Sequence, residues 1–336
     1  MLEAWYERER RELPWRATRD PYRILVSEVM LQQTRAQAVI PYYQRFLDRF
    51  PDVQTLAAAR EADVLALWSG LGYYSRARNL QRAAQAIVAR KRFPCGFDEI
   101  RELPGVGPYT AAAVASIAFG APHAVVDGNV LRVISRLCGD AADIQSPKTR
   151  ARFQLIADEW LDRRQPGLFN QAMMELGATV CLPRMPRCTA CPVASFCQAR
   201  HTGRQHELPV KGGKRAAQHI GLQVVIIAKE GSILLRRRAA TEPLMAGFWE
   251  LPALEDLPET QPGKTIGAFR HTITHHHYTI TVSTGALPAA PQGFQWRRLN
   301  RLAGIPLTTI TRKALGLLTS PPEAKSTLAG TAASAG

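Results

Sequence analysis

Four cysteines lie close together in the stretch CLPRMPRCTACPVASFC, residues 181–197. Their spacing is Cys181-x6-Cys188-x2-Cys191-x5-Cys197, with one tight pair and no histidine among them. Structural zinc usually takes two short pairs separated by a longer loop, whereas four thiolates on one compact loop suit the larger cage of an iron–sulfur cluster. The spacing therefore predicts metal ligation and favours a cluster, with a zinc ion as the alternative.

The rest of the chain argues against a disulfide framework for these cysteines. Six cysteines in 336 residues are far fewer than a disulfide-stapled fold uses. The N-terminal stretch MLEAWYERERRELPWR is charged and lacks an apolar signal core, and no uncharged apolar run reaches the length of a membrane span. We expect a soluble cytoplasmic protein that makes no membrane contact and keeps its thiols reduced.

A second stretch that could bind a ligand is LPGVGPYTAAAVASIAFG, which begins at Leu103. Gly105 and Gly107 flank Val106, and a helix is expected to start directly after them. The free N–H groups and the positive dipole end of such a helix can cradle a phosphate. An ordinary glycine-rich turn is the alternative, but a formal net charge of +15 indicates a polyanionic partner.

Two carboxyl groups stand in settings that favour different protonation states. Glu28 lies in the apolar helical stretch RILVSEVML, where burying the ionised form is costly, so its pKa should rise. A surface position at a helix edge is the alternative for Glu28. Asp127 precedes the helical stretch NVLRVISRL, a setting typical of a helix N-cap, where a carboxylate is expected to stay ionised.

Amphipathic helices must position these groups. Apolar residues recur at helical spacing throughout residues 1–200, for example in 21–33, 75–91, 107–120 and 169–181. Residues 201–218 are polar and basic, which indicates a linker, and strand-like alternation follows over 219–319. Residues 320–336 are small and polar, and we expect them to be disordered. The predicted class is α+β: a helical domain with the cysteine loop, then a small α/β domain.

These motifs together resemble a known family. LPGVG, followed by VVDGNV, FNQAMMELG and the cysteine spacing, is similar to the helix–hairpin–helix base-excision glycosylases. LPWR, SEVMLQQT and GLGYYSRARNL narrow the resemblance to the adenine glycosylase (MutY) family, over nearly the whole chain. The resemblance implies one [4Fe–4S] cluster at the four cysteines. It also implies a nucleoid-associated monomer that removes adenine mispaired with 8-oxoguanine or guanine in double-stranded DNA.

Cleaving an N-glycosidic bond needs an acid for the departing base and a negative neighbour for the cationic sugar. The resemblance gives these roles to Glu28 and Asp127, with Asn129 as the polar support of Asp127. Where the related endonuclease III branch has a Schiff-base lysine, this chain has Tyr109, which cannot form an imine and could instead order Glu28 or the sugar. The expected enzyme is monofunctional and leaves an abasic site.

The target base must leave the duplex before such chemistry can occur. The resemblance implies two groups of substrate contacts. They are the DNA-inserting residues Gln32 and Tyr73, with Gln33 and Thr34 beside them, and the adenine-pocket residues Trp15, Arg16 and Gln171. Core positions are the alternative for Tyr73 and Trp15.

The second domain is similar to the Nudix-like recognition domain of the same family. It lacks the glutamate-rich helix with which a Nudix hydrolase holds Mg²⁺, so we expect a reader of the lesion and not a hydrolase. The family's Phe-Ser-His contact corresponds to Ile273-Thr274-His275, which keeps the hydroxyl and the imidazole and loses the Phe. The run His275–His277 does not predict a metal site, because alternate strand residues face opposite ways.

Two other functions remain as alternatives. The first is an endonuclease III-like bifunctional glycosylase and lyase, which Tyr109 and the second domain oppose. The second is a non-enzymatic, redox-responsive DNA-binding protein, which the presence of both Glu28 and Asp127 opposes.

Overall fold

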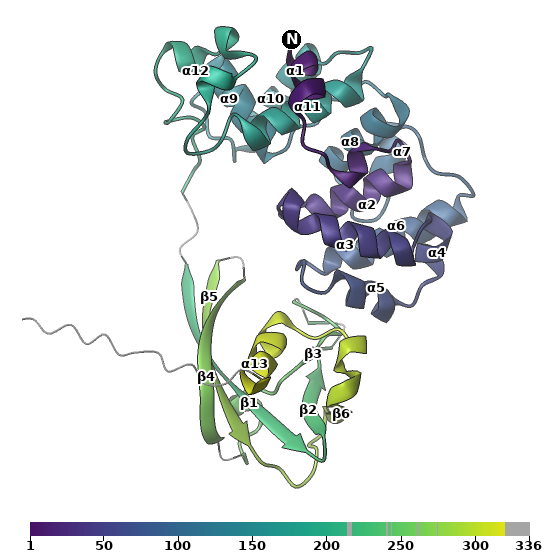
Figure 1. The fold of residues 1–336 in the computed structure, drawn as a ribbon, viewed down its shortest axis with the longest axis vertical. Coiled ribbons are helices and arrows are strands. Elements are labelled where there is room, and N and C mark those ends of the chain that lie inside the picture. Colours follow the sequence, from purple (N-terminus) through teal and green to yellow (C-terminus); the bar gives the residue numbers. More distant parts are fainter. Residues whose placement is uncertain (214–216, 240, 243, 261, 274, 320–336) are drawn as a thin grey trace, which may run out of the picture. The chain divides into compact units, whose positions relative to one another are not determined.

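The computed structural model describes residues 1–213, 217–239, 241–242, 244–260, 262–273 and 275–319. The chain divides into two compact units, Met1–Lys214 and Arg215–Gly336 (Figure 1). The α+β prediction is confirmed, because the first unit is helical and the second contains a mixed sheet. Thr274 and the tail 320–336 lie outside the described residues.

The described part of the first unit contains helices and no strands. The helices are α1 (Leu2–Glu9), α2 (Pro21–Leu31), α3 (Ala36–Arg49), α4 (Val53–Ala58), α5 (Glu61–Trp68), α6 (Ser75–Ala89), α7 (Phe97–Arg101), α8 (Pro108–Phe119), α9 (Gly128–Cys138), α10 (Pro147–Trp160), α11 (Pro166–Thr179) and α12 (Gln198–His201). Short 3-10 turns cover Pro14–Arg16, Cys188–Ala190 and Ala194–Phe196. Across all described residues, no helix has both the length and the apolar character needed to cross a bilayer.

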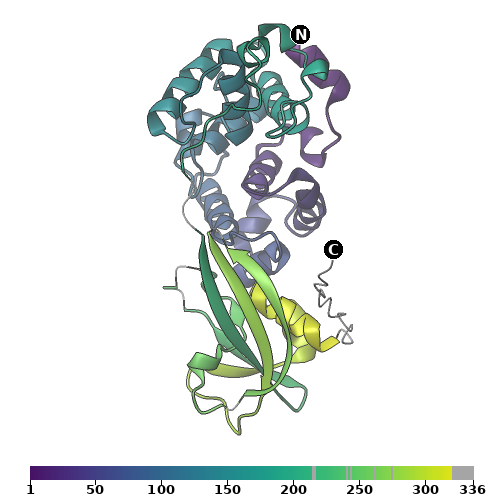
Figure 2. The same ribbon diagram turned by 90° about the vertical axis from the view of Figure 1, so that its left-hand side faces the viewer.

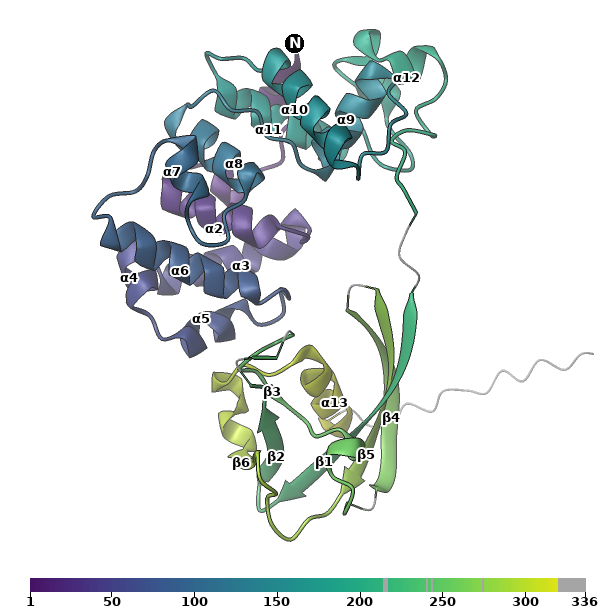
Figure 3. The same ribbon diagram turned by 180° about the vertical axis from the view of Figure 1, so that it is seen from behind.

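The helices of the first unit form two groups. Figure 3 shows α2 to α8 in one group and α1 with α9 to α12 in the other. The second group shares a core to which Tyr6, Ile134, Phe153 and Leu176 contribute fully buried side chains. Because α9 and α11 both pack into this core, it fixes the start of α9 relative to the cysteine loop that follows α11.

The second unit is built on a six-stranded mixed sheet. Its strands are β1 (Gln218–Lys229), β2 (Ser232–Arg237), β3 (Trp249–Glu250), β4 (Pro262–Ile273), β5 (His276–Gly285) and β6 (Phe294–Arg298). The order is β3-β2-β1-β5-β4, with β6 paired to β2, and only the β1–β5 pair among them is parallel. Helix α13 (Thr309–Thr319) lies against this sheet, and 3-10 turns cover Leu254–Asp256 and Leu299–Gly304 (Figure 2).

The central strand β1 is buried on both faces where it crosses the middle of the sheet. Val224 and Ile226 belong to the core that includes Ala314 of α13, while Val225 and Ile227 belong to a core on the other side. Alternate residues of a strand face opposite ways, so the unbroken apolar run of this strand serves two cores at once.

Part of the segment predicted as a linker is attached to the first unit. Ile144 N donates to Val210 O at 3.1 Å, and Gly212 N donates to Asp143 Oδ1 at 2.9 Å. Helix α12 ends at His201, and the chain from there to Gly212 has no regular secondary structure. The backbone therefore remains bonded to the helical unit up to a few residues before β1 begins.

The glycine turn before α8 gives a test of this fold. Gly105 has a φ of 74°, and a Cβ at this position would lie 2.4 Å from Asn79 Cβ. Gly105→Ala should lower the free energy of unfolding of the full chain by about 1–3 kcal/mol, measured by urea denaturation. Gly107→Ala is the control, because its φ is −88° and a Cβ there meets open space. An equal loss in both variants would contradict the steric explanation.

Candidate active site

A cavity of about 670 Å³ lies in the first unit, and both groups of helices contribute to its walls. Most of the predicted site residues line it. They are Trp15, Arg16, Glu28, Gln33, Thr34, Tyr109, Asp127, Asn129 and Gln171. Segments that lie far apart in the sequence therefore converge on one space large enough for a purine base and part of its sugar.

Glu28 is buried on α2 and faces this cavity, with only 4% of its surface exposed. Tyr109 donates its phenolic O–H to Glu28 Oε2 at 2.7 Å. Burial raises the pKa of Glu28 to about 7, and the nearby charge of Asp127 also raises it, while the hydrogen bond from Tyr109 lowers it. The predicted rise is confirmed, and the surface alternative for Glu28 is wrong.

Asp127 is the N-cap residue of α9, as its sequence setting predicts. Its Oδ1 accepts hydrogen bonds from Asn129 N at 2.8 Å and Val130 N at 2.7 Å, and its Oδ2 accepts one from Asn129 Nδ2 at 2.8 Å. Burial nevertheless raises the pKa of Asp127, and these hydrogen bonds only partly oppose the rise. The helix start favours the ionised carboxylate, as expected, but the cavity wall that encloses the group acts in the opposite direction and outweighs it.

Asn129 links Asp127 to a buried arginine. Arg132 Nη2 donates to Asn129 Oδ1 at 3.0 Å and to Gly177 O at 2.7 Å, and Arg132 Nε donates to Cys181 O at 2.8 Å. The side-chain amide of Asn129 is thereby oriented with its nitrogen toward Asp127. The start of α9 is connected in this way to the end of α11 and to the first cysteine of the loop.

Tyr109 stands in the first turn of α8, where its side chain is partly buried beside both carboxyl groups. Its hydroxyl also lies 3.5 Å from Met174 Sδ. Burial, followed by the charges of Glu28 and Asp127, raises the pKa of Tyr109 well above its usual range. The phenol therefore stays protonated and acts only as a hydrogen-bond donor to Glu28.

Ring packing, a hydrogen bond and a cation–π contact fix the residues that are predicted to form an adenine pocket. Trp15 is 7% exposed and packs edge-on against Tyr43, with ring centroids 5.4 Å apart, so it is both a core residue and part of the cavity wall. Tyr6 OH donates to Gln171 Oε1 at 3.1 Å, and the guanidinium of Arg16 lies 5.3 Å from the centre of the Tyr6 ring.

Glu175 is a site residue that the sequence reasoning missed. It is fully buried on α11, lines the cavity and accepts hydrogen bonds from Arg11 at 2.8 Å and from Arg16 at 2.6 Å. Burial alone would raise its pKa, but the bonds from the two arginines lower it to about 2. The signal was available, because Glu175 interrupts the apolar stretch MMELG as Glu28 interrupts its own helix.

The residues predicted to insert into DNA lie outside the cavity. Tyr73 is 45% exposed with a φ of 49°, so it is not a core aromatic. Gln32 Nε2 donates to Thr110 Oγ1 at 3.2 Å and shares a small cavity with Gly105 and Val106 of the turn before α8. These two predicted DNA-contacting features, the Gln32 segment and the glycine turn, therefore lie side by side.

His275 belongs to the second unit. Its ring packs against that of His276 with centroids 4.1 Å apart, and its carbonyl accepts a hydrogen bond from Gln218 N at 2.9 Å. His277 instead packs against His219 of β1, at 5.2 Å. His276 and His277, which begin β5, therefore have different neighbours, as strand alternation predicts, whereas His275 precedes the strand and packs against His276.

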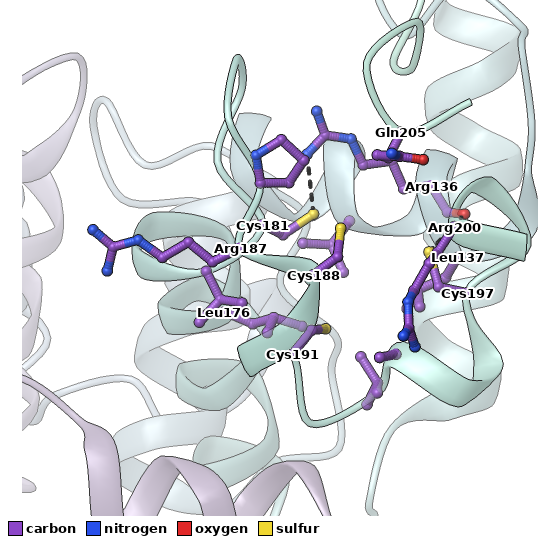
Figure 4. A pocket seen from close by; sticks show the side chains of 15 residues that line it. Arg136, Leu137, Leu176, Cys181, Arg187, Cys188, Cys191, Cys197, Arg200 and Gln205 are labelled. Atoms are coloured by element: carbon purple, nitrogen blue, oxygen red, sulfur yellow. Dashed lines mark hydrogen bonds between the residues drawn. The ribbon is translucent and has the colours of Figure 1, made fainter. Parts of the chain in front are cut away.

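The four clustered cysteines line one small cavity of about 20 Å³ (Figure 4). Arg136 Nη1 donates to Cys181 Sγ at 3.2 Å and to Leu182 O at 2.7 Å, so the guanidinium holds the start of the loop. Within the described residues, no three His, Cys, Asp or Glu side chains are arranged to hold a metal ion. Four thiols facing one space, with a guanidinium beside them, do fit the sulfur donors and the negative charge of an iron–sulfur cluster.

Known proteins resemble this chain over both units. Residues 26–158 match the family model of HhH-GPD superfamily base excision DNA repair proteins, and residues 223–317 match that of the NUDIX domain. The adenine DNA glycosylase of Mus musculus is 32% identical, over 93% of this chain and 76% of its own length. The chain belongs to the adenine DNA glycosylase family. This membership makes it a DNA N-glycosylase, which confirms the predicted enzyme class.

Other members of the family are similar over a smaller share of their length. The human adenine DNA glycosylase is 46% identical over 63% of this chain, which spans 41% of the human protein. That of Buchnera aphidicola (subspecies Acyrthosiphon pisum) is 34% identical over 71% of this chain and 69% of its own length.

Two solved structures support the fold of the helical unit. A thermostable thymine-DNA glycosylase superimposes with a TM-score of 0.55 at 29% identity, over 60% of this chain and 94% of that one. A trapped endonuclease III–DNA covalent intermediate superimposes with a TM-score of 0.51 at 23% identity, over 60% of this chain and 93% of that one.

The buried Glu28 carboxyl should make stability depend on pH. Its pKa is raised in the folded state from 4.5 to about 7, so its contribution is present below pH 4.5 and is lost as pH rises through 7. As pH rises from about 5 to about 8, the unfolding free energy of Glu28→Gln should increase by up to ~3 kcal/mol relative to that of the wild type. Urea denaturation across this range measures the difference. The exposed Glu159→Gln is the control, and a pH-independent difference for Glu28→Gln would contradict the burial effect.

Proposed function

We propose that this chain removes adenine mispaired with 8-oxoguanine or guanine in double-stranded DNA, as a monofunctional glycosylase in base-excision repair. The main support is that Glu28 and Asp127 line the same cavity in different hydrogen-bond environments. One carboxyl group contacts a phenol, and the other accepts two backbone N–H bonds and an amide bond. Such a pair suits one neutral acid and one carboxylate.

Glu28 serves as the general acid in this proposal. With a pKa of about 7, it carries a proton in a large fraction of molecules at neutral pH. As the bond between C1′ and the base nitrogen breaks, its electron pair moves to the adenine, and Glu28 donates its proton to the base. The resulting carboxylate then takes a proton from the water that adds to C1′, which restores the acid.

Asp127 stabilises the cationic sugar in the same step. Its three hydrogen bonds favour the ionised form and fix the direction of the carboxylate. Asn129 supplies two of them and is itself held by Arg132. Tyr109 has no amine with which to attack C1′, so the product is an abasic site and not a cleaved strand.

Trp15, Arg16 and Gln171 bind the extruded adenine in this proposal. Trp15 presents an indole at the cavity wall, while a guanidinium and an amide can satisfy the polar edge of a purine. Glu175 neutralises Arg16 and leaves it in place as a hydrogen-bond donor. The pocket thus offers polar partners to the base without adding an unpaired cation next to Glu28.

Extrusion of the base is assigned to Tyr73 and Gln32, which do not line the cavity. Tyr73 and Gln32 enter the duplex at the target pair, with Gln33 and Thr34 beside them. The turn Gly105–Val106–Gly107 holds a backbone phosphate at the start of α8. The net charge of +15 supplies the long-range attraction to the polyanion.

The second unit reads the base opposite adenine. His275 contacts 8-oxoguanine in this proposal, together with Thr274, which lies outside the described residues. The unit has no glutamate-dense helix for Mg²⁺, so it binds the lesion without hydrolysing a nucleotide. The loss of the family's Phe at Ile273 leaves the hydrogen-bonding residues to carry this recognition.

The cysteines Cys181, Cys188, Cys191 and Cys197 hold one [4Fe–4S] cluster in this proposal. When bound, the cluster supplies iron–sulfur bonds that tie the loop to the end of α11. Arg136 stabilises the thiolate of Cys181 and anchors the same loop through Leu182. The role assigned to the cluster is structural, because the cavity lined by the four cysteines shares no lining residue with the adenine cavity.

Adenine release tests the proposed reaction directly. The wild-type chain should release adenine from a duplex with A opposite 8-oxoguanine faster than from one with A opposite thymine. Its single-turnover rate should fall as pH rises through about 7, because Glu28 then loses its proton. Glu28→Gln should slow release by roughly 10²–10⁴-fold, while Glu159→Gln leaves it unchanged.

Three results would contradict the proposal. Release by Glu28→Gln at the wild-type rate would remove Glu28 as the acid. Strand breaks that form without alkali, or a borohydride-trapped protein–DNA adduct, would favour the bifunctional lyase. Binding without any base release would favour a non-enzymatic DNA-binding protein.

Metal analysis tests the proposed cluster. The purified chain should contain equal amounts of iron and acid-labile sulfide, in the ratio to protein that a [4Fe–4S] cluster requires. Cys191→Ser should lose most of this iron and unfold at lower temperature. Cys138→Ser is the control, because Cys138 is exposed and lies outside the cluster cavity. Zinc in place of iron would support the alternative ligation.

A further inference from the structure

Arg76 is a buried guanidinium on α6, with 8% of its surface exposed. Arg76 forms no ion pair with an acidic side chain of the described residues, and its Nε is buried without a hydrogen bond. Burial lowers the pKa of Arg76 to about 10, so it remains cationic at neutral pH. A buried cation of this kind is costly unless its remaining donors are well satisfied.

The terminal nitrogens of Arg76 bind two loop segments at once. Nη1 donates to the carbonyls of Val29, Met30 and Gln32, and Nη2 donates to Thr34 Oγ1 and to the carbonyls of Leu71 and Gly72. The first set joins the end of α2 to Gln32, and the second set joins Thr34 to Leu71 and Gly72. The guanidinium also lies 5.5 Å from the ring centres of both Trp68 and Tyr73.

Both segments hold a non-glycine residue in the left-handed region. Gln33 has a φ of 56° and Tyr73 a φ of 49°. Each directly follows a residue whose carbonyl Arg76 binds, namely Gln32 and Gly72. Such conformations are strained and persist only where the surroundings enforce them. Four contacts from this one side chain, to Gln32, Thr34, Leu71 and Gly72, provide that enforcement for both segments.

We propose that Arg76 is a positioning residue that fixes segments 32–34 and 71–73 relative to each other, so that Gln32 and Tyr73 enter DNA as one rigid wedge. The inference rests on the base extrusion proposed above. Arg76 itself is buried and touches neither DNA nor the reacting atoms. Arg76 orders segments 32–34 and 71–73 before DNA binds, so the entropy cost of ordering them does not weaken binding.

Lysine cannot reproduce this arrangement. Its ammonium has three donors on one atom, whereas the guanidinium spreads its donors over a planar fork that reaches acceptors on two segments. Arg76→Lys keeps the positive charge and most of the aliphatic stem while removing the link between the loops. Arg82→Lys is the matched control, because Arg82 is an exposed residue on the same helix.

The experiment compares single-turnover adenine release at saturating protein on two duplexes. In one, adenine stands opposite 8-oxoguanine; in the other, it stands opposite a tetrahydrofuran abasic analogue, so extrusion costs less. Arg76→Lys should be slowed roughly 10- to 100-fold on the paired substrate and much less on the unpaired one, while Arg82→Lys matches the wild type on both. An equal loss on both duplexes indicates a general structural defect and overturns the proposal, as does no loss on either.

A second measurement separates this inference from the proposed extrusion. In a Glu28→Gln background, 2-aminopurine beside the target adenine should brighten on binding, as the stack opens. Arg76→Lys should abolish most of this rise. If the Tyr73→Ala variant shows the wild-type rise in fluorescence and the wild-type rate of adenine release, the proposed extrusion by Gln32 and Tyr73 is wrong. If Tyr73→Ala is impaired and Arg76→Lys is normal, only the role of Arg76 is wrong.

Discussion

Two carboxyl groups share one cavity, and their mutual repulsion prevents both from being ionised at low cost. The structure resolves this conflict by hydrogen bonding. Asp127 accepts three bonds that favour its charged form, whereas Glu28 accepts one, from the phenol of Tyr109. Two arginines of the cavity wall, Arg11 and Arg16, are bonded to Glu175. Burial of Glu28, with a smaller contribution from the charge of Asp127, raises its pKa to about 7.

Helix α9 connects this charge arrangement to the cysteine loop. Asp127 caps its start, Arg132 lies in its second turn and Arg136 follows four residues later on the same face. Arg132 binds the carbonyl of Cys181, and Arg136 binds its sulfur. One rigid element therefore carries the carboxylate at one end and holds the first ligand of the proposed cluster near the other.

Several of these features could be predicted from sequence because their causes are local. An acid in an apolar helix and an aspartate before a helix start are visible in a linear stretch, and Glu28 and Asp127 are where those patterns predict. The pKa direction of Asp127 is different, since it depends on the walls that enclose it. Glu175 gave the same local signal as Glu28 and was overlooked. Arg76 gave none, because its acceptors are mainly backbone carbonyls, which every residue has.

Strand β1 has a consequence for how the second unit withstands disturbance. Its residues Val224 to Ile227 face apolar neighbours on both sides, and its long pairing with β5 continues through the middle of the sheet. The amide hydrogens of such a strand exchange with deuterated solvent only when the sheet opens. The helical unit has an apolar core of its own, formed by α1, α9, α10 and α11. Each unit therefore has its own cooperative core, and a substitution that destabilises one core does not by itself unfold the other.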